Sequence, residues 1–132
     1  MNEMKFTIIL PTYNESQNVA PLVKSVHDAL EKSYAGVYEI LFVDDSDDKT
    51  ASEIRKQIKK YSNIRLIHRK KENRTGLAMA FVDGFKQACG EYILCMDSDL
   101  QHPPEKIPEM LRKITADKKL DLVIASRYKK GG

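Results

Sequence analysis

Short apolar runs alternate with longer amphipathic segments along this chain, and the alternation predicts strands and helices in turn. The runs that predict strands are Phe6 to Leu10, Glu39 to Val43, Ile64 to His68, Tyr92 to Met96 and Asp121 to Ala125. Helices are predicted between them, over residues 16–32, 49–61, 76–88 and 105–117, with boundaries good to about 2–4 residues. Since the strand runs are apolar on both faces and helical crossovers join them, we expect an α/β fold with a mostly parallel sheet and helices on both faces.

Residues typical of helix ends mark several of these boundaries. Asn14 or Ser16 is placed to cap the first helix, and Asp47 or Asp48 the second, because short polar side chains satisfy the free N–H groups of a first turn. Gly90 is a candidate for the end of the third helix. No repeat or linker interrupts the pattern, so we expect one domain over residues 1–132.

Composition and charge exclude little. The 22 Lys and Arg residues exceed the 19 Asp and Glu residues by three, which is a weak argument for a nucleic-acid partner, and we expect none. The basic runs at 69–71 and 129–130 are interpreted as solvated surface. Cys89 and Cys95 lack metal-ligand spacing and are expected to be reduced core cysteines of a cytoplasmic protein. No stretch approaches the ~20 apolar residues of a membrane span, and no signal-peptide pattern begins the chain.

Two carboxylates one residue apart, Asp97 and Asp99, directly follow the fourth apolar run. A run that stops abruptly in acids and prolines predicts a buried strand that delivers charge to a loop at its end. Carboxylate oxygens in such a loop suit Mg²⁺ or Mn²⁺, which share their coordination shells with substrate phosphates. Because an isolated Asp-x-Asp is common by chance, its weight comes from its place at a strand end.

The other predicted strands also end in polar residues, at 11–15, 44–48 and 126–128. In open parallel sheets, ligands bind outside the carboxyl ends of the strands. Tyr13 can pack on a base or sugar, and Asp45 can accept hydrogen bonds from a base. A metal together with Arg127 can hold a diphosphate. The strand ends together therefore predict a nucleotide pocket.

Each of these residues also has a structural interpretation that the residues themselves leave open. Pro11 suits a turn, and Tyr13 suits a partly buried aromatic. Arg74, taken alone, is better explained as a surface arginine before a tight turn than as a phosphate ligand. His68 and His102 lack metal-ligand companions and suit turn or core positions.

Several competing site types fail on the motifs. Neither a glycine-rich dinucleotide fingerprint nor a P-loop occurs, and an EF-hand loop from Asp97 would need glycine where His102 stands. A response-regulator receiver is a more serious rival, because it shares the length and the strand-end acids. Its acid pair should follow the first strand, however, whereas residues 44–45 follow the second. An Asp-x-Asp phosphatase of the haloacid type fails because Asp97 comes far too late.

Five segments resemble the ordered motifs of the family 2 glycosyltransferases. They are Ile8–Glu15, Phe42–Ser46, Gly76–Ala78, Met96–Pro103 and Ser126–Tyr128. The nearest subgroup comprises dolichol-phosphate mannosyltransferase-like and bactoprenol glycosyltransferase-like enzymes, and the resemblance runs from Lys5 to Tyr128. Each motif alone is weak, but the set in this order is specific.

The resemblance implies a Rossmann-like GT-A fold and an inverting, metal-dependent hexosyltransferase that uses a UDP- or GDP-sugar. The implied acceptor is a polyprenyl phosphate, dolichyl or undecaprenyl, or a growing glycan. With Arg74 as a further phosphate candidate, the implied nucleotide-sugar ligands are Pro11, Tyr13, Glu15, Val43, Asp45, Arg74, Asp97, Ser98, Asp99 and Arg127. The implied ligands of Mg²⁺ or Mn²⁺ are Asp97, Asp99 and Gln101, and the implied catalytic residues are Asp99 and Arg127.

The chain also departs from the family pattern. Ser46 and Ala78 stand where many relatives have glycine, and we expect these changes to tune the site without removing a charged ligand. Relatives continue past the fifth strand with more of the acceptor site and often with membrane helices, so we expect a truncated catalytic domain from the cytoplasmic face of a membrane. The alternative is a nucleotide-sugar-binding module or an inactive fragment, and a receiver domain is a distant third.

Overall fold

The computed structural model describes residues 4–74, 76–96 and 104–117 of the chain. Its elements follow in the order β1 (Phe6–Thr12), α1 (Ser16–Tyr34), β2 (Tyr38–Asp44), α2 (Thr50–Lys60), β3 (Ile64–His68), the 3₁₀ turn η1 (Lys71–Asn73), α3 (Leu77–Gln87), β4 (Tyr92–Cys95), the 3₁₀ turn η2 (Pro104–Lys106) and α4 (Ile107–Ala116). The four predicted strands and four predicted helices of this part of the chain are confirmed. The fifth predicted strand, at 121–125, lies outside the described residues.

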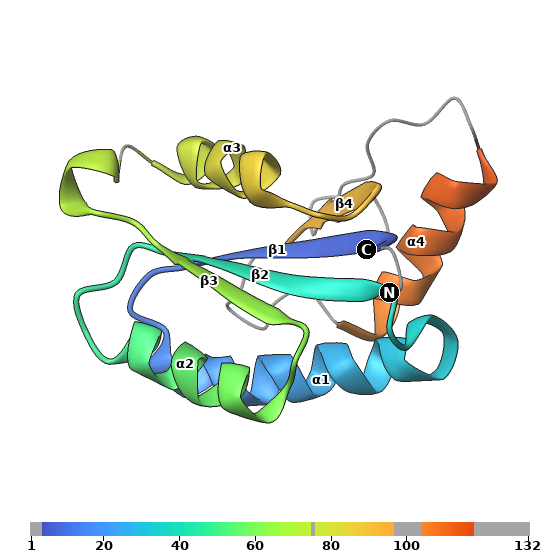
Figure 1. The fold of residues 1–132 in the computed structure, drawn as a ribbon, viewed down its shortest axis with the longest axis horizontal. Helices are drawn as coiled ribbons and strands as arrows, with labels where there is room; N and C mark the ends of the chain where they lie inside the picture. Colours follow the sequence, from blue (N-terminus) through green and yellow to red (C-terminus); the bar gives the residue numbers. More distant parts are fainter. Residues whose placement is uncertain (1–3, 75, 97–103, 118–132) are drawn as a thin grey trace, which may run out of the picture.

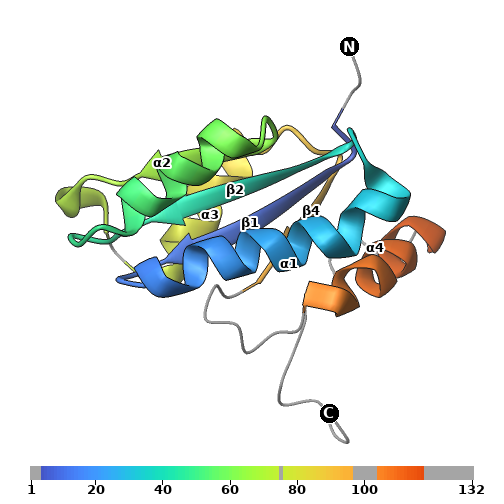
Figure 2. The ribbon, with the colours of Figure 1, turned by 90° about the horizontal axis from the view of Figure 1, so that it is seen from below.

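The four strands form one parallel sheet in the order β3-β2-β1-β4. Helices α1 and α2 cover one face, α3 covers the other, and α4 lies beside α1 (Figures 1 and 2). The predicted α/β class, with helices on both faces of a parallel sheet, is confirmed. Because all four strands run the same way, their carboxyl ends meet at one edge of the sheet, where the loops after β1, β2 and β3 gather.

The core lies on both faces of the sheet, and this accounts for strands without polar alternation. Ile8 and Leu10 belong to the cluster beneath α1 and α2, whereas Ile9, between them, belongs to a smaller cluster with Ala80 of α3. Successive side chains of a strand point to opposite faces, so β1 must be apolar at consecutive positions. Gly84 lets α3 approach the sheet closely, because a Cβ there would lie 2.9 Å from Ile9 Cδ1.

The helix ends correct part of the sequence interpretation. Helix α1 begins at Ser16 without a side-chain cap, so neither Asn14 nor Ser16 caps it as predicted. Asn14 instead adopts a left-handed conformation, with φ at +51°, in a loop whose N–H groups bond to other side chains. The second helix has Lys49 at its N-cap, without a side-chain capping bond. Asp48, one residue earlier, accepts the Thr50 N–H at 2.9 Å, so the prediction is right about the N–H group and wrong about the cap position.

Two expectations near the end of α3 are wrong. The helix ends at Gln87, before Gly90, which lies instead against the backbone of β1. Cys89 is exposed and is therefore no core residue, while Cys95 of β4 is half-buried. Both thiols are free, as expected.

Candidate functional site

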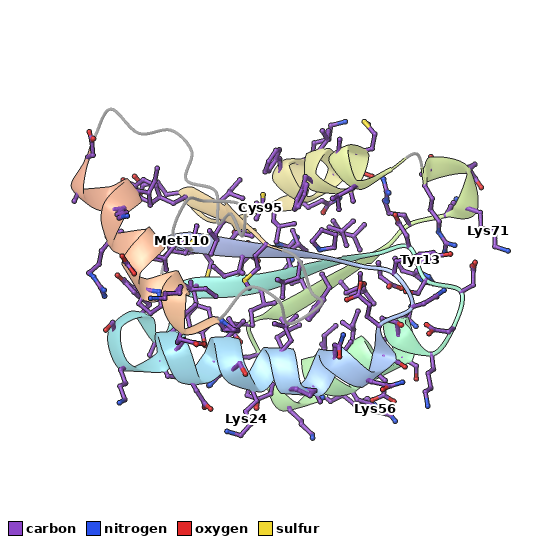
Figure 3. All side chains as sticks on the ribbon, turned by 180° about the vertical axis from the view of Figure 1, so that it is seen from behind. Tyr13, Lys24, Lys56, Lys71, Cys95 and Met110 are labelled. Carbon is purple, nitrogen blue, oxygen red and sulfur yellow. The ribbon has the colours of Figure 1, made fainter. Side chains whose placement is uncertain are left out.

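A cavity of about 660 Å³ opens at the carboxyl edge of the sheet, between the loops after β1 and β2 and the start of α3. Figure 3 shows Tyr13 and Lys71, which both line it, at the same end of the molecule. The predicted site residues among its lining are Pro11, Tyr13, Glu15, Asp45 and Arg74. The structure thus brings together residues that are up to 63 positions apart, Pro11 and Arg74, as the strand-end rule predicts.

Side chains satisfy three consecutive N–H groups in the loop after β1. The Tyr13 N–H donates to Glu15 Oε1 at 3.1 Å, the Asn14 N–H to Ser46 Oγ at 2.7 Å, and the Glu15 N–H to Thr50 Oγ1 at 3.0 Å. Two of the three acceptors come from the loop after β2 and the start of α2. These amides are already engaged, so the loop contributes Glu15 and Tyr13 to the cavity lining, and Tyr13 is 65% exposed.

The Asp44 carboxylate is buried behind the cavity, among other polar side chains. Its Oδ1 accepts hydrogen bonds from the hydroxyls of Thr12 and Ser46, both at 2.6 Å. Its Oδ2 has no hydrogen-bond partner among the described residues and lies 3.5 Å from His68 Nε2. That nitrogen also lies 3.1 Å from the carbonyl oxygen of Ser46 and 3.4 Å from Nη2 of Arg74. His68 thereby links the end of β3 to the loop after β2.

Asp45 faces the cavity and is held from behind by Arg69. The guanidinium donates from Nε to Oδ1 at 2.7 Å and from Nη2 to Oδ2 at 2.5 Å, and its Nη1 lies 3.3 Å from Asp83 Oδ2 on α3. Hydrogen bonding to Asp45 raises the pKa of Arg69, and burial only partly offsets this effect. Such a two-point pair fixes the plane of the carboxylate as well as its position.

Arg69 corrects the interpretation of the basic run at 69–71. Its side chain is 2% exposed, whereas that of Lys71 is 79% exposed, so the expectation of solvated surface holds for Lys71 and is wrong for Arg69. The reason is that two carboxylates, from different elements, compensate the charge of Arg69. The sequence carries one signal for the pair of Arg69 with Asp45. Arg69 directly follows β3, and Asp45 directly follows β2, the strand that pairs with β3.

Arg74 is anchored at the rim of the cavity. Its Nη1 donates to Asp47 Oδ1 at 2.7 Å, its Nη2 to the carbonyl oxygen of Ser46 at 3.3 Å, and its Nε to that of Arg69 at 3.1 Å. The hydrogen bond from Arg74 also lowers the pKa of Asp47. Asp47 therefore pairs with Arg74, while Asp48 accepts the Thr50 N–H at the start of α2. A free surface arginine is not what the structure shows, since the Arg74 side chain is 16% exposed.

Val43 lies away from the cavity. Its side chain is fully buried in the cluster beneath α3, with Ile9, Leu41 and Ala80, and it does not line the cavity. Its predicted contact with a nucleoside therefore cannot come from an exposed side chain in this arrangement. The prediction for Val43 came from the resemblance to the family.

The remaining predicted ligands lie outside the described residues. They are Asp97, Ser98, Asp99, Gln101 and Arg127. His102, for which a turn or core position was expected, also lies outside the described residues. The Met96 N–H donates to the carbonyl oxygen of Ile9 at 3.1 Å, so the chain passes beside β1 immediately before Asp97. Over residues 4–74, 76–96 and 104–117, no group of three or more His, Cys, Asp or Glu side chains could hold a metal ion. In that same part of the chain, no helix is long and apolar enough to span a bilayer.

Comparisons with known proteins agree on one family. The sequence profile described as glycosyl transferase family 2 matches residues 7–132. The chain is 42% identical over 130 residues to dolichol-phosphate mannosyltransferase of Pyrococcus furiosus, covering 98% of this chain and 35% of that protein. It is 36% identical over 112 residues to the enzyme of the same name from Saccharomyces cerevisiae, covering 84% of this chain and 41% of that one. The chain thus spans less than half the length of these relatives.

Solved structures show the same fold. The mannosyltransferase PcManGT from Pyrobaculum calidifontis, in complex with GDP-Man and Mn²⁺, superposes with a TM-score of 0.70 and 25% identity. The match covers 88% of this chain and 33% of that one. TarS from S. aureus, in complex with UDP-GlcNAc, superposes with a TM-score of 0.59 and 32% identity, over 73% of this chain and 27% of that one.

Proposed function

Because the chain belongs to glycosyltransferase family 2, we propose that its cavity binds the nucleotide of a nucleoside diphosphate sugar and that the protein transfers the sugar to a polyprenyl phosphate. One observation carries the proposal. Tyr13, Asp45 and Arg74, from three separate strand ends, line a single cavity at the carboxyl edge of a GT-A sheet. This is the edge at which parallel α/β sheets bind their ligands.

The chemical character of the cavity fits a nucleotide. The exposed ring of Tyr13 offers a flat face to a base or a sugar, and Asp45, fixed by Arg69, offers carboxylate oxygens to base N–H groups. Lys71 and Arg74 are the basic residues of the lining, and each pairs with Asp47, which lines the cavity as well. Relatives in complex with GDP-Man and with UDP-GlcNAc support a nucleotide sugar as the donor class.

The acceptor follows from the names of the curated relatives. Dolichol-phosphate mannosyltransferases at 42% and 36% identity support a polyprenyl phosphate as the acceptor class. Its phosphate is already an anion near neutral pH, so positioning and electrostatics can drive the transfer without a protein base. Because such an acceptor is a membrane lipid, we also place the protein at the cytoplasmic face of a membrane.

Transfer breaks the bond between the anomeric carbon and the donor phosphate, and an acceptor phosphate oxygen forms the new bond from the opposite side. Negative charge then grows on the departing nucleoside diphosphate. A divalent metal supplies Lewis-acid stabilisation of that charge, and the Mn²⁺ complex of PcManGT supports such an ion. Asp97, Asp99 and Gln101 would hold the ion, while Arg127 would meet phosphate.

Calorimetric titration tests the donor site. UDP and GDP are each titrated with and without Mn²⁺ into the wild type, Asp99→Asn and the control Asp28→Asn, which alters an exposed ion pair on α1. We expect metal-dependent binding of one nucleotide, weakened by Asp99→Asn and unchanged by Asp28→Asn. A folded wild type that binds neither nucleotide with Mn²⁺ present would refute the donor site. Binding without transfer to polyprenyl phosphate in vesicles would favour the binding-module alternative.

A further inference from the structure

The Ser46 hydroxyl lies between the two loops that carry Tyr13 and Asp45. Its Oγ donates to Asp44 Oδ1 at 2.6 Å and accepts the Asn14 N–H at 2.7 Å. Ser46 is 1% exposed and is not among the residues that line the cavity. A single buried hydroxyl therefore joins the loop after β1 to the loop after β2 from behind the cavity.

The positions of these bonds matter for the two cavity residues. Asn14 directly follows Tyr13, and Ser46 directly follows Asp45, so the bond between Asn14 and Ser46 joins the backbone beside one cavity residue to the backbone beside the other. Asn14 also has a positive φ of +51°, which residues other than glycine seldom adopt without support. The hydrogen bond from its N–H supplies part of that support.

The Asp44 carboxylate makes the arrangement directional. A carboxylate oxygen can only accept, so the Ser46 hydroxyl proton points to Asp44 Oδ1, which also accepts the Thr12 hydroxyl. A lone pair of Ser46 Oγ is therefore left for the Asn14 N–H. Without the Ser46 hydroxyl, the Asn14 N–H would lose the acceptor that it has in the described loop. The Tyr13 loop would then depend on the remaining bonds to this side, from the Glu15 N–H to Thr50 Oγ1 and from the Asp45 N–H to the Thr12 carbonyl oxygen, both at 3.0 Å.

We propose that Ser46 is a positioning residue of the nucleotide site, which sets Tyr13 relative to Asp45 through the Asn14 N–H and the Asp44 carboxylate. This inference rests on the proposed function, because it assigns Tyr13 and Asp45 to one nucleotide. Ser46 itself touches no ligand, so its effect on binding is indirect and comes from the spacing of the two loops. Loss of its hydroxyl weakens nucleotide binding more than the accompanying loss of stability explains.

The chain contains a matched control at the other end of β1. The Thr7 hydroxyl donates to the buried Glu39 carboxylate at 2.6 Å and accepts the Gly90 N–H at 2.8 Å. These are the same two interactions that Ser46 makes, but they lie away from the carboxyl edge of the sheet. Thr7→Val removes this hydroxyl without changing the shape of the side chain.

The test compares Ser46→Ala and Thr7→Val in the 132-residue chain, at a temperature at which both remain folded. Amide exchange by NMR is expected to quicken at Asn14 only in Ser46→Ala and at Gly90 only in Thr7→Val. Calorimetry with UDP and GDP plus Mn²⁺ is expected to show about tenfold weaker binding for Ser46→Ala and wild-type binding for Thr7→Val. Ser46→Cys, which keeps the volume but hydrogen-bonds weakly, serves as a second variant if Ser46→Ala does not fold, with an intermediate loss expected.

The outcomes separate this inference from the proposed function. Equal nucleotide affinities for Ser46→Ala and Thr7→Val would overturn the positioning role while leaving the nucleotide site intact. Unchanged exchange at Asn14 in Ser46→Ala would overturn it as well. A folded wild type that binds neither nucleotide refutes the proposed function itself, and the exchange at Asn14 then still decides whether Ser46 holds the loop.

Discussion

Arg69 donates hydrogen bonds to both carboxylate oxygens of Asp45, from Nε to Oδ1 at 2.7 Å and from Nη2 to Oδ2 at 2.5 Å. The same guanidinium lies 3.3 Å from Asp83 on α3 and 3.4 Å from the carbonyl oxygen of Gly76. One side chain at the end of β3 thus connects the loop after β2 to the helix that forms the other wall of the cavity. The orientation of Asp45 and the position of α3 are consequently coupled.

Replacing Arg69 should be costly for stability. Arg69→Met leaves Asp45 and Asp83 without their buried cation, and we expect a loss of about 2–4 kcal/mol in the free energy of unfolding. The expected loss is smaller than for breaking a fully buried ion pair, because the carboxylates of Asp45 and Asp83 both keep some contact with solvent. Urea denaturation measures the loss. Lys71→Met is the control, since its 3.9 Å pair with Asp47 is exposed, and an equal loss there would contradict the assignment.

Gly90 should tolerate no side chain. A Cβ at this position would lie 2.5 Å from the backbone nitrogen of Thr7 and 2.6 Å from the carbonyl carbon of Phe6, and backbone atoms inside a sheet cannot move aside. We expect Gly90→Ala to lower the free energy of unfolding by about 2–4 kcal/mol. Gly84→Ala is the comparison in the same thermal melts. Its Cβ would meet side-chain atoms of Ile9, at 2.9 and 3.0 Å, and no backbone atom among its three nearest contacts, so we expect a smaller loss, and one as large as that of Gly90→Ala would contradict this account.

Glu39 should make stability sensitive to acid. Burial by itself raises the pKa of this carboxyl, but hydrogen bonds from the Thr7 hydroxyl, Arg65 and the Cys89 N–H outweigh it and lower the pKa below its ordinary value. A lowered folded-state pKa means that the contribution is complete above the unfolded-state pKa of about 4.3 and is lost as the pH falls through the folded-state value.

The measurement is the midpoint of urea unfolding between pH 7 and pH 3. Glu39→Gln should be less stable than the wild type at pH 7, and the gap should narrow as the pH falls below about 4.3. Glu72→Gln, in the exposed η1 turn, should follow the wild-type curve throughout. A gap between wild type and Glu39→Gln that stays constant with pH would show that the charge of Glu39 is not what stabilises the fold.

The two thiols should differ in reactivity. Burial raises the pKa of Cys95 to about 11, so on the order of one molecule in a thousand carries the thiolate at pH 8, whereas Cys89 is exposed. Iodoacetamide should therefore modify Cys89 in the native protein and reach Cys95 only after denaturation, as read by mass spectrometry. Cys89→Ser should remain unmodified while folded. Rapid native labelling of that variant would place Cys95 at the surface.

Tyr13, Asp45 and Arg69 show how much of the candidate site can be predicted from the sequence. Tyr13 and Asp45 were predicted because each follows an apolar run, and the carboxyl ends of parallel strands share an edge whatever the details of packing. Arg69 also follows an apolar run, yet its place in a basic run suggested solvent. Its true partners, Asp45 and Asp83, lie 24 and 14 positions away, and only the pairing of β2 with β3 and the packing of α3 bring them within reach.

The helix caps show the same division at shorter range. Asp48 accepts an N–H group at the start of α2, as predicted, because Thr50 lies only two residues away. Asn14 does not cap α1 and adopts a left-handed conformation, in which its N–H donates to the hydroxyl of Ser46, 32 positions away. A sequence pattern around Asn14 contains no information about a hydrogen-bond partner that follows a different strand.

The sequence by itself determined the parallel α/β sheet and the edge at which a ligand would bind. Hydrophobic periodicity and crossovers between strands depend on residues within a few positions of one another, so they can be read along the chain. Only the tertiary structure decided that Arg69 holds Asp45, that Ser46 joins the two loops and that Val43 belongs to the core. Those outcomes depend on which strands become neighbours and on which side chains then compete for the same buried hydrogen bonds.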